Sequence, residues 1–404
     1  MASDDQPPGG ELPIGRRMAQ WRVRRRMTQQ VLADRLGKSK SWVDKVERGV
    51  RALDKVSVLN EVAEVLRVDP VTLLGQGTPP PVTAAATDGV EGVRAALAIR
   101  DAAPSRPGGR LVPSADAVAR QVEHAWLAYQ HARYPQVLRL LPDLLGAARH
   151  RYAGDADPTT GLLVQAYRIT AQVLVKLGEA DLGWLAADRA VNAAGGDPLL
   201  TAAATVPLGA ALRTLDRPRL ALAATLAAAD RAAPPMLGQA APVELSVCGT
   251  LLVEAALAAA DCPEPDGVAD LLEQAAELAR LVGDGHDHQW TGFGPTAVEL
   301  ARTTAAALLG APGDAVDRYE RATGRNAWQR LPVEHRAAHL LDVARAYLDS
   351  GDPSAAGRLL VEADRIAPAE VRVRPVARDL VTTVTRSGAA PAGLLGLATA
   401  IGAA

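Results

Sequence analysis

The chain has 404 residues, a formal net charge of −2, and 48% hydrophobic but only 3% aromatic residues. Its length exceeds that of one ordinary hydrophobic core, so two or more structural units are expected. The scarcity of aromatic residues argues against β-sandwiches and barrels, whereas the abundance of alanine and leucine favours an all-α fold with closely packed helices.

The near-zero net charge is the sum of two regions of opposite sign. Residues 14–67 contain 14 Lys/Arg against 6 Asp/Glu, and the rest of the chain is mildly acidic. A small basic unit attached to a large acidic body indicates a polyanion as the partner of the basic unit only.

Cysteine content and hydropathy argue against several classes of protein. Cys248 and Cys262 are too few for a disulfide framework or a zinc cluster. No apolar run approaches the roughly 20 residues of a membrane-spanning helix, and the acidic start "MASDDQPPGGE" does not resemble a signal peptide. We therefore expect a cytoplasmic protein without membrane association, in which residues 1–13 form a disordered tail.

Five short helices are expected between residues 14 and 75. The first has apolar residues at Ile14, Met18 and Trp21, with arginines on most other faces. Thr28 can cap a second helix, "QQVLADRLG", and Ser39 a third, "KSWVDKVERG". A fourth amphipathic helix, "LDKVSVLNEVAEVLRV", and a short fifth, "DPVTLLG", follow.

The second and third helices have the spacing of a helix-turn-helix. Ala33 is a small residue where the two helices would touch, and Gly37 lies at the bend, where a positive φ is needed. Val43 and Val46 lie three residues apart and would form the inner face of the third helix. The alternative is a generic pair of short helices.

The stretch "RRMAQWRVRRRMTQQVLADRLGKSKSWVDKVERG" resembles the Cro/CI-type helix-turn-helix of the XRE family of bacterial repressors, over about residues 14–75. Gln29 matches the glutamine that opens the family's second helix. Glu47, Arg48 and Gly49 match the end of its third helix. The resemblance implies a structural salt bridge between Arg22 and Glu47, since a guanidinium would relieve a carboxylate near a helix C-terminus.

The resemblance also implies that helix 39–48 enters the major groove of DNA. Lys40, Ser41 and Lys45 correspond to the family's base-contacting positions. Asp44 could accept a hydrogen bond from cytosine, or hold Lys40 or a first-helix arginine in place. Trp42 departs from the family's small or polar residue, and could pack on DNA or on a loop of its own domain.

Four further residues are candidates for contacts with phosphates. Gln29 would present its backbone N–H at a helix N-terminus. Lys38, Arg48 and Arg51 flank the same helix, although each could equally be a solvated surface charge.

Beyond residue 75 the pattern changes to a linker and then to helical repeats. Residues 76–114 contain "QGTPPPVTAAAT" and, within "GVEGVRAALAIRD", room for a short helix. From 115 to 388, helical stretches alternate with short breaks at a period of about 35–45 residues, which predicts six or seven hairpins stacked as an α-solenoid. Residues 389–404 would form a C-terminal tail or a capping helix.

The stretch "AHLLDVARAYLDSGDPSAAGRLLVEADRIAP" resembles a tetratricopeptide repeat. Ala344, Ala356 and Ala363 are small residues that let its two helices approach, and Gly351 lies in the turn. "YRITAQVLVKLGEADLGWLAADRA" is a second copy, and weaker copies follow it, one at Gly209, Ala221 and Ala228 and another at Ala315 and Ala322. As a whole, the chain resembles large actinobacterial XRE regulators with a tetratricopeptide-like C-terminal half.

No catalytic constellation is recognisable. His335 and His339 have helical i,i+4 spacing without a third metal ligand, so we interpret them as a surface pair. His286 and His288 lie in a Gly-rich break that could be an ordered loop or the wall of a ligand pocket. Phosphate-binding loops, dinucleotide fingerprints and nucleophile elbows are absent from the sequence, so we expect neither an enzyme nor a cofactor or metal.

The sequence therefore predicts a sequence-specific transcription regulator that binds double-stranded DNA, as a homodimer on an inverted-repeat operator. The repeat half would serve dimerisation, or sensing of a peptide or protein effector, or both. The alternative is a protein-interaction scaffold whose helix-turn-helix is used for non-specific DNA binding or protein docking.

Overall fold

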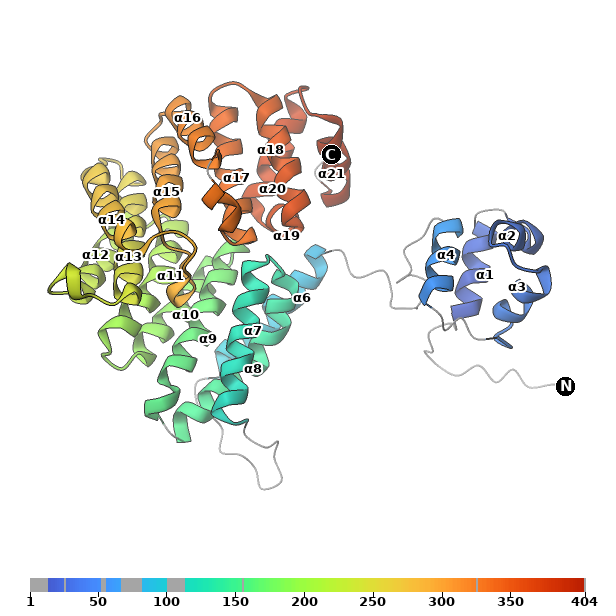
Figure 1. Ribbon diagram of the computed structural model, residues 1–404, viewed down its shortest axis with the longest axis horizontal. Helices are drawn as coiled ribbons and strands as arrows, with labels where there is room; N and C mark the ends of the chain where they lie inside the picture. Colours follow the sequence, from blue (N-terminus) through green and yellow to red (C-terminus); the bar gives the residue numbers. More distant parts are fainter. Residues whose placement is uncertain are drawn as a thin grey trace. The chain divides into compact units, whose positions relative to one another are not determined.

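The computed structural model describes seven stretches of the chain: residues 14–24, 27–51, 56–66, 82–99, 113–154, 156–324 and 326–402. All regular elements in these stretches are helices, as expected for an all-α chain (Figure 1). The chain forms two compact units, Met1–Ala85 and Ala86–Ala404. The expected N-terminal tail and the fifth helix of the first unit lie outside the described residues.

The first unit contains the four remaining helices where they were expected. They are α1 (Ile14–Arg24), α2 (Gln29–Arg35), α3 (Lys40–Glu47) and α4 (Val56–Leu66). Thr28 and Ser39 act as N-caps, each accepting a hydrogen bond from a backbone N–H in the first turn of its helix. Gly37 and Gly49 have φ of 62° and 76° after α2 and α3, which glycine adopts without strain.

Helices α1, α2, α3 and α4 share one small apolar core, in which Met18, Leu32 and Val43 are fully buried. Helices α1 and α3 are in direct backbone contact at Gly15. A Cβ atom on Gly15 would lie 1.9 Å from the carbonyl oxygen of Val46. The orientation of α3 on α1 therefore depends on a glycine at this position, a requirement that helical periodicity does not predict.

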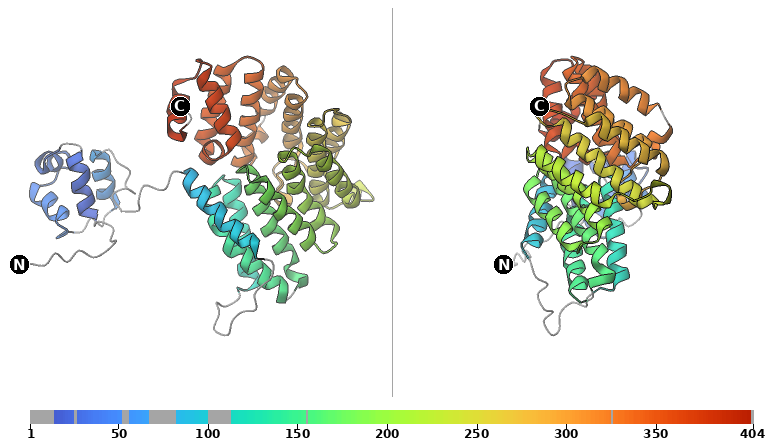
Figure 2. Two further views of the ribbon diagram at one scale, coloured as in Figure 1. Left: turned by 180° about the vertical axis from the view of Figure 1, so that it is seen from behind. Right: turned by 90° about the vertical axis from the view of Figure 1, so that its left-hand side faces the viewer.

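The second unit, called the body here, is built from six successive helical hairpins in its described residues (Figures 1 and 2). They are α7 (Ala115–Gln130) with α8 (Tyr134–Gly154), α9 (Ala156–Lys176) with α10 (Ala180–Ala193), α11 (Pro198–Thr214) with α12 (Pro218–Ala232), α13 (Pro242–Ala260) with α14 (Val268–Val282), α15 (Pro295–Leu308) with α16 (Pro312–Thr323), and α17 (Val333–Asp349) with α18 (Pro353–Ile366). The chain ends with α19 (Pro368–Arg372), α20 (Pro375–Arg386) and α21 (Ala392–Ile401). The first helices of successive hairpins contact one another, as in a solenoid.

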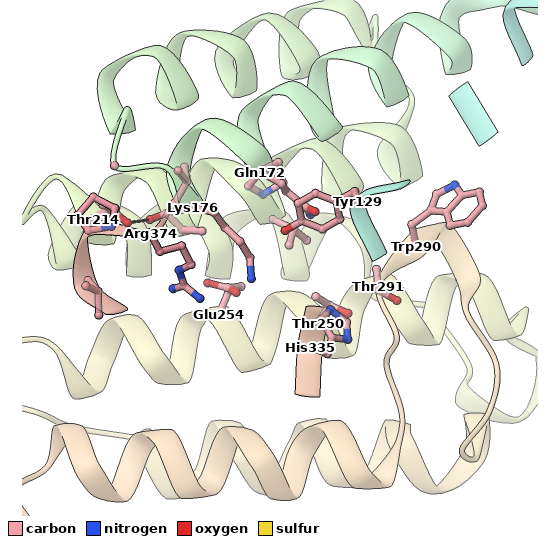
Figure 3. A pocket seen from close by; sticks show the side chains of 17 residues that line it. Tyr129, Gln172, Lys176, Thr214, Thr250, Glu254, Trp290, Thr291, His335 and Arg374 are labelled. Atoms are coloured by element: carbon pink, nitrogen blue, oxygen red, sulfur yellow. Dashed lines mark hydrogen bonds between the residues drawn. The ribbon is translucent and has the colours of Figure 1, made fainter. Parts of the chain in front are cut away.

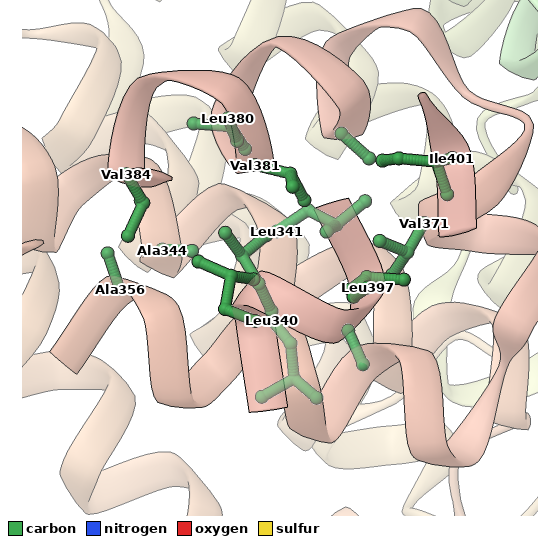
Figure 4. Packing of buried hydrophobic residues seen from close by; sticks show 14 of the residues in the cluster. Leu340, Leu341, Ala344, Ala356, Val371, Leu380, Val381, Val384, Leu397 and Ile401 are labelled. Carbon is green, nitrogen blue, oxygen red and sulfur yellow. The ribbon is translucent and has the colours of Figure 1, made fainter. Parts of the chain in front are cut away.

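The hairpin of α17 and α18 has the packing expected of a tetratricopeptide repeat. Ala344, Ala356 and Ala363 have no exposed surface, and Gly351 adopts a positive φ in the turn. Figure 4 shows the core that α17 shares with α20 and α21, in which Leu341, Val381 and Leu397 meet. Helix α21 covers the apolar end of the stack, which is the role of a capping helix.

Two expectations about the body need correction. The stretch 76–114 was expected to be a linker with a possible short helix, but within its described residues α6 (Val82–Ala98) is a helix of 17 residues. It packs closely on α8, because a Cβ on Gly89 would lie 2.7 Å from Leu138, and Arg149 of α8 donates to the carbonyl oxygen of Ala96 at 3.0 Å. The second unit therefore starts at Ala86 rather than near Ala115.

The expectation that no apolar run approaches membrane-spanning length is also wrong. Helix α13 has 19 residues and is long and apolar enough to cross a membrane by length and composition. Most of it is buried inside the body, in contact with α11, α12, α14 and α15. This burial accounts for its composition, because a helix surrounded by other helices is apolar on all sides.

The solenoid closes on itself within the body. Lys176 at the end of α9 forms ion pairs with Glu334 of α17 and with Glu370 of α19, the latter at 2.8 Å. Tyr129 and Tyr134, from α7 and α8, donate hydrogen bonds to the same two carboxylates. The first hairpins are thus joined to the last helices by buried polar contacts, which we call the closure cluster.

Candidate nucleic-acid interface

Helix α3 has one buried and one exposed face. Val43 and Val46 are buried in the core of the first unit, whereas Lys40, Ser41 and Lys45 are exposed. Because residues i and i+4 share a face of a helix, Ser41 and Lys45 lie side by side on the outer surface. The three residues assigned to base contacts are therefore accessible together.

Helix α3 is held against α1 by an ion pair. Arg22 donates to both carboxylate oxygens of Glu47, with Nε–Oε1 at 2.6 Å and Nη2–Oε2 at 3.0 Å. Its remaining nitrogen donates to the carbonyl oxygen of Met27 at 2.8 Å. Glu47 is only 6% exposed, so this bidentate pair replaces the water that the carboxylate has lost.

Gln29 has a second role besides the proposed phosphate contact. Its side-chain Nε2 donates to Oε2 of Glu47 at 2.8 Å, so the amide belongs to the structural pair. Only its backbone N–H at the start of α2 is left for a phosphate. Lys38 and Arg51 are exposed on either side of α3, where charges can reach a DNA backbone.

Asp44 and Arg48 pair with each other on α3. This corrects the suggestion that Asp44 holds Lys40 or a first-helix arginine, because an i+4 arginine on the same helix is a nearer partner. Arg48 is 61% exposed, so its guanidinium could exchange this carboxylate for a phosphate.

Trp42 is half-buried and packs against the core of the first unit. The ring was expected to pack either on DNA or on its own domain, and packing on its own domain is observed. The packing leaves part of the ring exposed, so a contact of Trp42 with DNA stays a prediction.

The histidines of the body are arranged differently from the expectation. His339 is buried at 5% exposure and packs against the rings of Tyr319 and Trp328, so His335 and His339 are not a surface pair. The cause is that this side of α17 faces the interior of the body. Among the described residues, no group of three or more His, Cys, Asp or Glu could hold a metal ion.

The segment between α14 and α15 is an ordered loop that also forms part of a cavity wall. It contains the short η2 (His288–Trp290), and the rings of His286 and His288 stack at 5.7 Å. Trp290 and Thr291 line a cavity in the body. The segment is thus ordered, as one of the two expectations had it, and whether the cavity holds a ligand stays a prediction.

Comparisons with known proteins identify the first unit. Residues 13–74 match the family model of a helix-turn-helix domain. Among solved structures, the chain is similar to Bacillus thuringiensis PlcR in complex with the peptide PapR7 and DNA, with 12% identity, coverage of 68% of this chain and 96% of that chain, and a TM-score of 0.27. No match was found among curated proteins. The N-terminal unit is thus a helix-turn-helix domain.

Proposed function

We propose that the protein is a sequence-specific, DNA-binding transcription regulator of the XRE type, acting in the cytoplasm. The observation that carries the proposal is the exposed face of α3, where Lys40, Ser41 and Lys45 lie on a helix of a helix-turn-helix domain. Lysine donates to the O6 and N7 atoms of guanine, and serine can donate or accept. The basic charge of residues 14–67 supplies attraction to the DNA backbone.

Alanine substitutions of Lys40 and Lys45 should each weaken binding to the preferred operator by about 1–3 kcal/mol and reduce discrimination against other sequences. Arg51→Ala should instead weaken binding to all duplexes about equally, because a phosphate contact carries no sequence information. Titrations of full-length protein on the operator and on a random duplex, at fixed salt, measure both effects. Unchanged relative affinity in both lysine variants would show that these residues do not contact bases.

We further propose that the active form is a homodimer on an inverted repeat. A single helix-turn-helix contacts only a few base pairs, so two copies on a two-fold site are needed for useful selectivity. Light scattering of the full-length protein, free and on its DNA, should give the mass of two chains. A monomer bound to one unrepeated half-site would contradict this prediction.

The body would then hold the two copies together, or sense a peptide or protein effector, or do both. A solenoid of this size exceeds what dimerisation of a small DNA-binding unit needs. If the body senses an effector, the effector must change operator affinity, and DNA must change effector affinity by the same factor.

A further inference from the structure

Two adjoining cavities lie inside the body, with volumes of about 370 and 220 Å³. Both are lined by Thr250 and Glu254 of α13, by Thr291 of the loop before α15, and by His335 of α17. Figure 3 shows the larger one, with Glu254 among the polar side chains that line it. Their combined volume is within the range of small-molecule sites in proteins.

On one side of the cavities the charges are balanced. Lys176 and Arg374 line the larger cavity, and each is bonded to a carboxylate of the closure cluster. Arg374 Nη1 lies 2.5 Å from Glu370 Oε2, and Lys176 is shared between Glu370 and Glu334. These two cations are therefore neutralised by two carboxylates.

On the other side, Arg213 is the cation that pairs with both Asp261 and Glu254, and Asp342 forms no ion pair among the described residues. Arg213 Nε donates to Asp261 at 2.7 Å, but its Nη1 lies 3.6 Å from Glu254 Oε2, which is too long for a hydrogen bond. The Oε2 atom of Glu254 is buried without a hydrogen-bond partner. The third carboxylate, Asp342, accepts a bond from Thr304 at 3.2 Å. Negative charge is thus in excess at the walls formed by Glu254 and Asp342.

Burial shifts the pKa of both carboxyl groups in the same direction. Burial raises the pKa of Glu254, although Arg213 opposes the shift. Burial also raises the pKa of Asp342, against the opposing effect of Arg374 and other cations. A carboxylate that is desolvated and incompletely paired destabilises the folded state, so both groups would gain from an added cation.

A second observation in the smaller cavity also points to a ligand. His339 is buried at its wall, and its Nε2 atom has no hydrogen-bond partner among the described residues. Burial lowers the pKa of His339 to about 3, so the ring is neutral near pH 7 and does not offset the carboxylates. A polar atom without a partner thus lies at the wall of the same cavity that Glu254 and Asp342 line.

The loop wall of the larger cavity is rigidly held in a strained conformation. Gln289 and Trp290 have φ of 55° and 59°, which non-glycine residues rarely adopt. Trp290 stacks on Trp126 with ring centroids 5.8 Å apart, and Arg168 donates to the carbonyl oxygen of Gln289 at 3.0 Å. Such strain is concentrated at functional positions such as ligand clamps.

We propose that the two cavities form one binding site for a small organic cation. Its ammonium or guanidinium group binds Glu254 and Asp342, and its apolar part lies against the aromatic wall at Trp290. An anion is disfavoured, because the cations that line the cavity are already paired with Glu334 and Glu370. The proposal concerns the body alone and goes beyond the proposed function, because it does not require DNA binding by the first unit.

The test uses full-length protein with phenethylamine as the probe, and 3-phenylpropionate as a probe of similar shape and opposite charge. Saturation-transfer NMR and calorimetry without DNA should detect binding of the amine and not of the acid. Glu254→Gln keeps the shape of the side chain and removes its charge, so it should weaken amine binding about tenfold or more. Glu264→Gln, on the exposed loop between α13 and α14, is the matched control and should bind as the wild type does.

Asp342→Asn provides a second, independent variant, and thermal melting of each variant verifies that the body is folded. The proposal is overturned if the amine does not bind, if the acid binds equally well, or if either folded variant binds the amine with wild-type affinity. None of these outcomes depends on operator binding, so failure of this site and failure of the proposed function are separately observable.

Discussion

Replacing Arg22 by alanine should destabilise the first unit by about 3–5 kcal/mol, because it leaves the buried carboxylate of Glu47 without its cation. That loss is a large part of the stability of a small domain. Operator binding should fall with it, although Arg22 itself is not assigned to DNA. Hydrogen exchange of the full-length protein, measured on peptides from α1, α2 and α3, should show lost protection there and unchanged protection in the body.

Two further variants distinguish the loss of the Arg22–Glu47 ion pair from the general effect of removing an arginine from α1. Arg16→Ala removes an exposed arginine from the same helix and should change exchange very little. The double variant Arg22→Met, Glu47→Met should regain much of the stability, because it removes the buried charge together with its partner. If Arg22→Ala alone kept full protection of α3, the pair would not be what holds this helix in place.

The parts of the fold that the sequence predicted well depend on local chemistry. Thr28 and Ser39 cap their helices, and Gly37 and Gly49 take positive φ after them, because these requirements involve residues close together in the chain. The small residues of the tetratricopeptide-like hairpin were recognisable for the same reason. Helices that are neighbours in sequence pack on each other, so spacing alone indicates the contact face.

The parts that were not predicted depend on contacts between distant segments. The closure cluster joins residues up to 236 positions apart, and periodicity carries no information about such pairs. One signal was present: Lys176 is the only lysine after Lys55, and it directly follows the apolar residues "VLV". Glu254, within the apolar α13, was a similar signal of a charge that faces the interior.

The candidate DNA interface was accessible to sequence reasoning, but the roles of individual side chains were not. Outward and inward positions on α3 follow from helical periodicity, and the described structure has Lys40 and Lys45 on the outer surface. Trp42 and Asp44 each had several plausible partners, and the choice between them depends on distances. Gly15 was overlooked because the need for a glycine arises only where α1 meets the backbone of α3.

Replacing Lys176 by methionine should destabilise the body by about 3–5 kcal/mol, since it leaves two buried carboxylates without their shared cation. Glu334 and Glu370 are 2% and 0% exposed, so water cannot replace the lost ammonium. Methionine has a similar length, which keeps the loss of packing small. Urea unfolding of the full-length protein, followed by a probe in the body, measures the change. Arg365→Met breaks the exposed ion pair with Glu362 and is the matched control, for which we expect no measurable change.

The pH dependence of the stability difference between wild type and Lys176→Met shows whether the charge of Lys176 or its packing causes that difference. Burial alone would raise the pKa of Glu370. The neighbouring cations Lys176 and Arg374 outweigh burial and lower this pKa from its ordinary value of 4.5 to about 2. A carboxyl with a lowered pKa in the folded state contributes stability that is complete above its unfolded-state pKa and is lost as the pH falls toward its folded-state pKa. The stability difference between wild type and Lys176→Met should therefore be largest above about pH 4.5 and shrink steadily toward pH 2. A difference that stays constant over this range would mean that Lys176 stabilises the body by packing, and that its charge does not hold the closure cluster together.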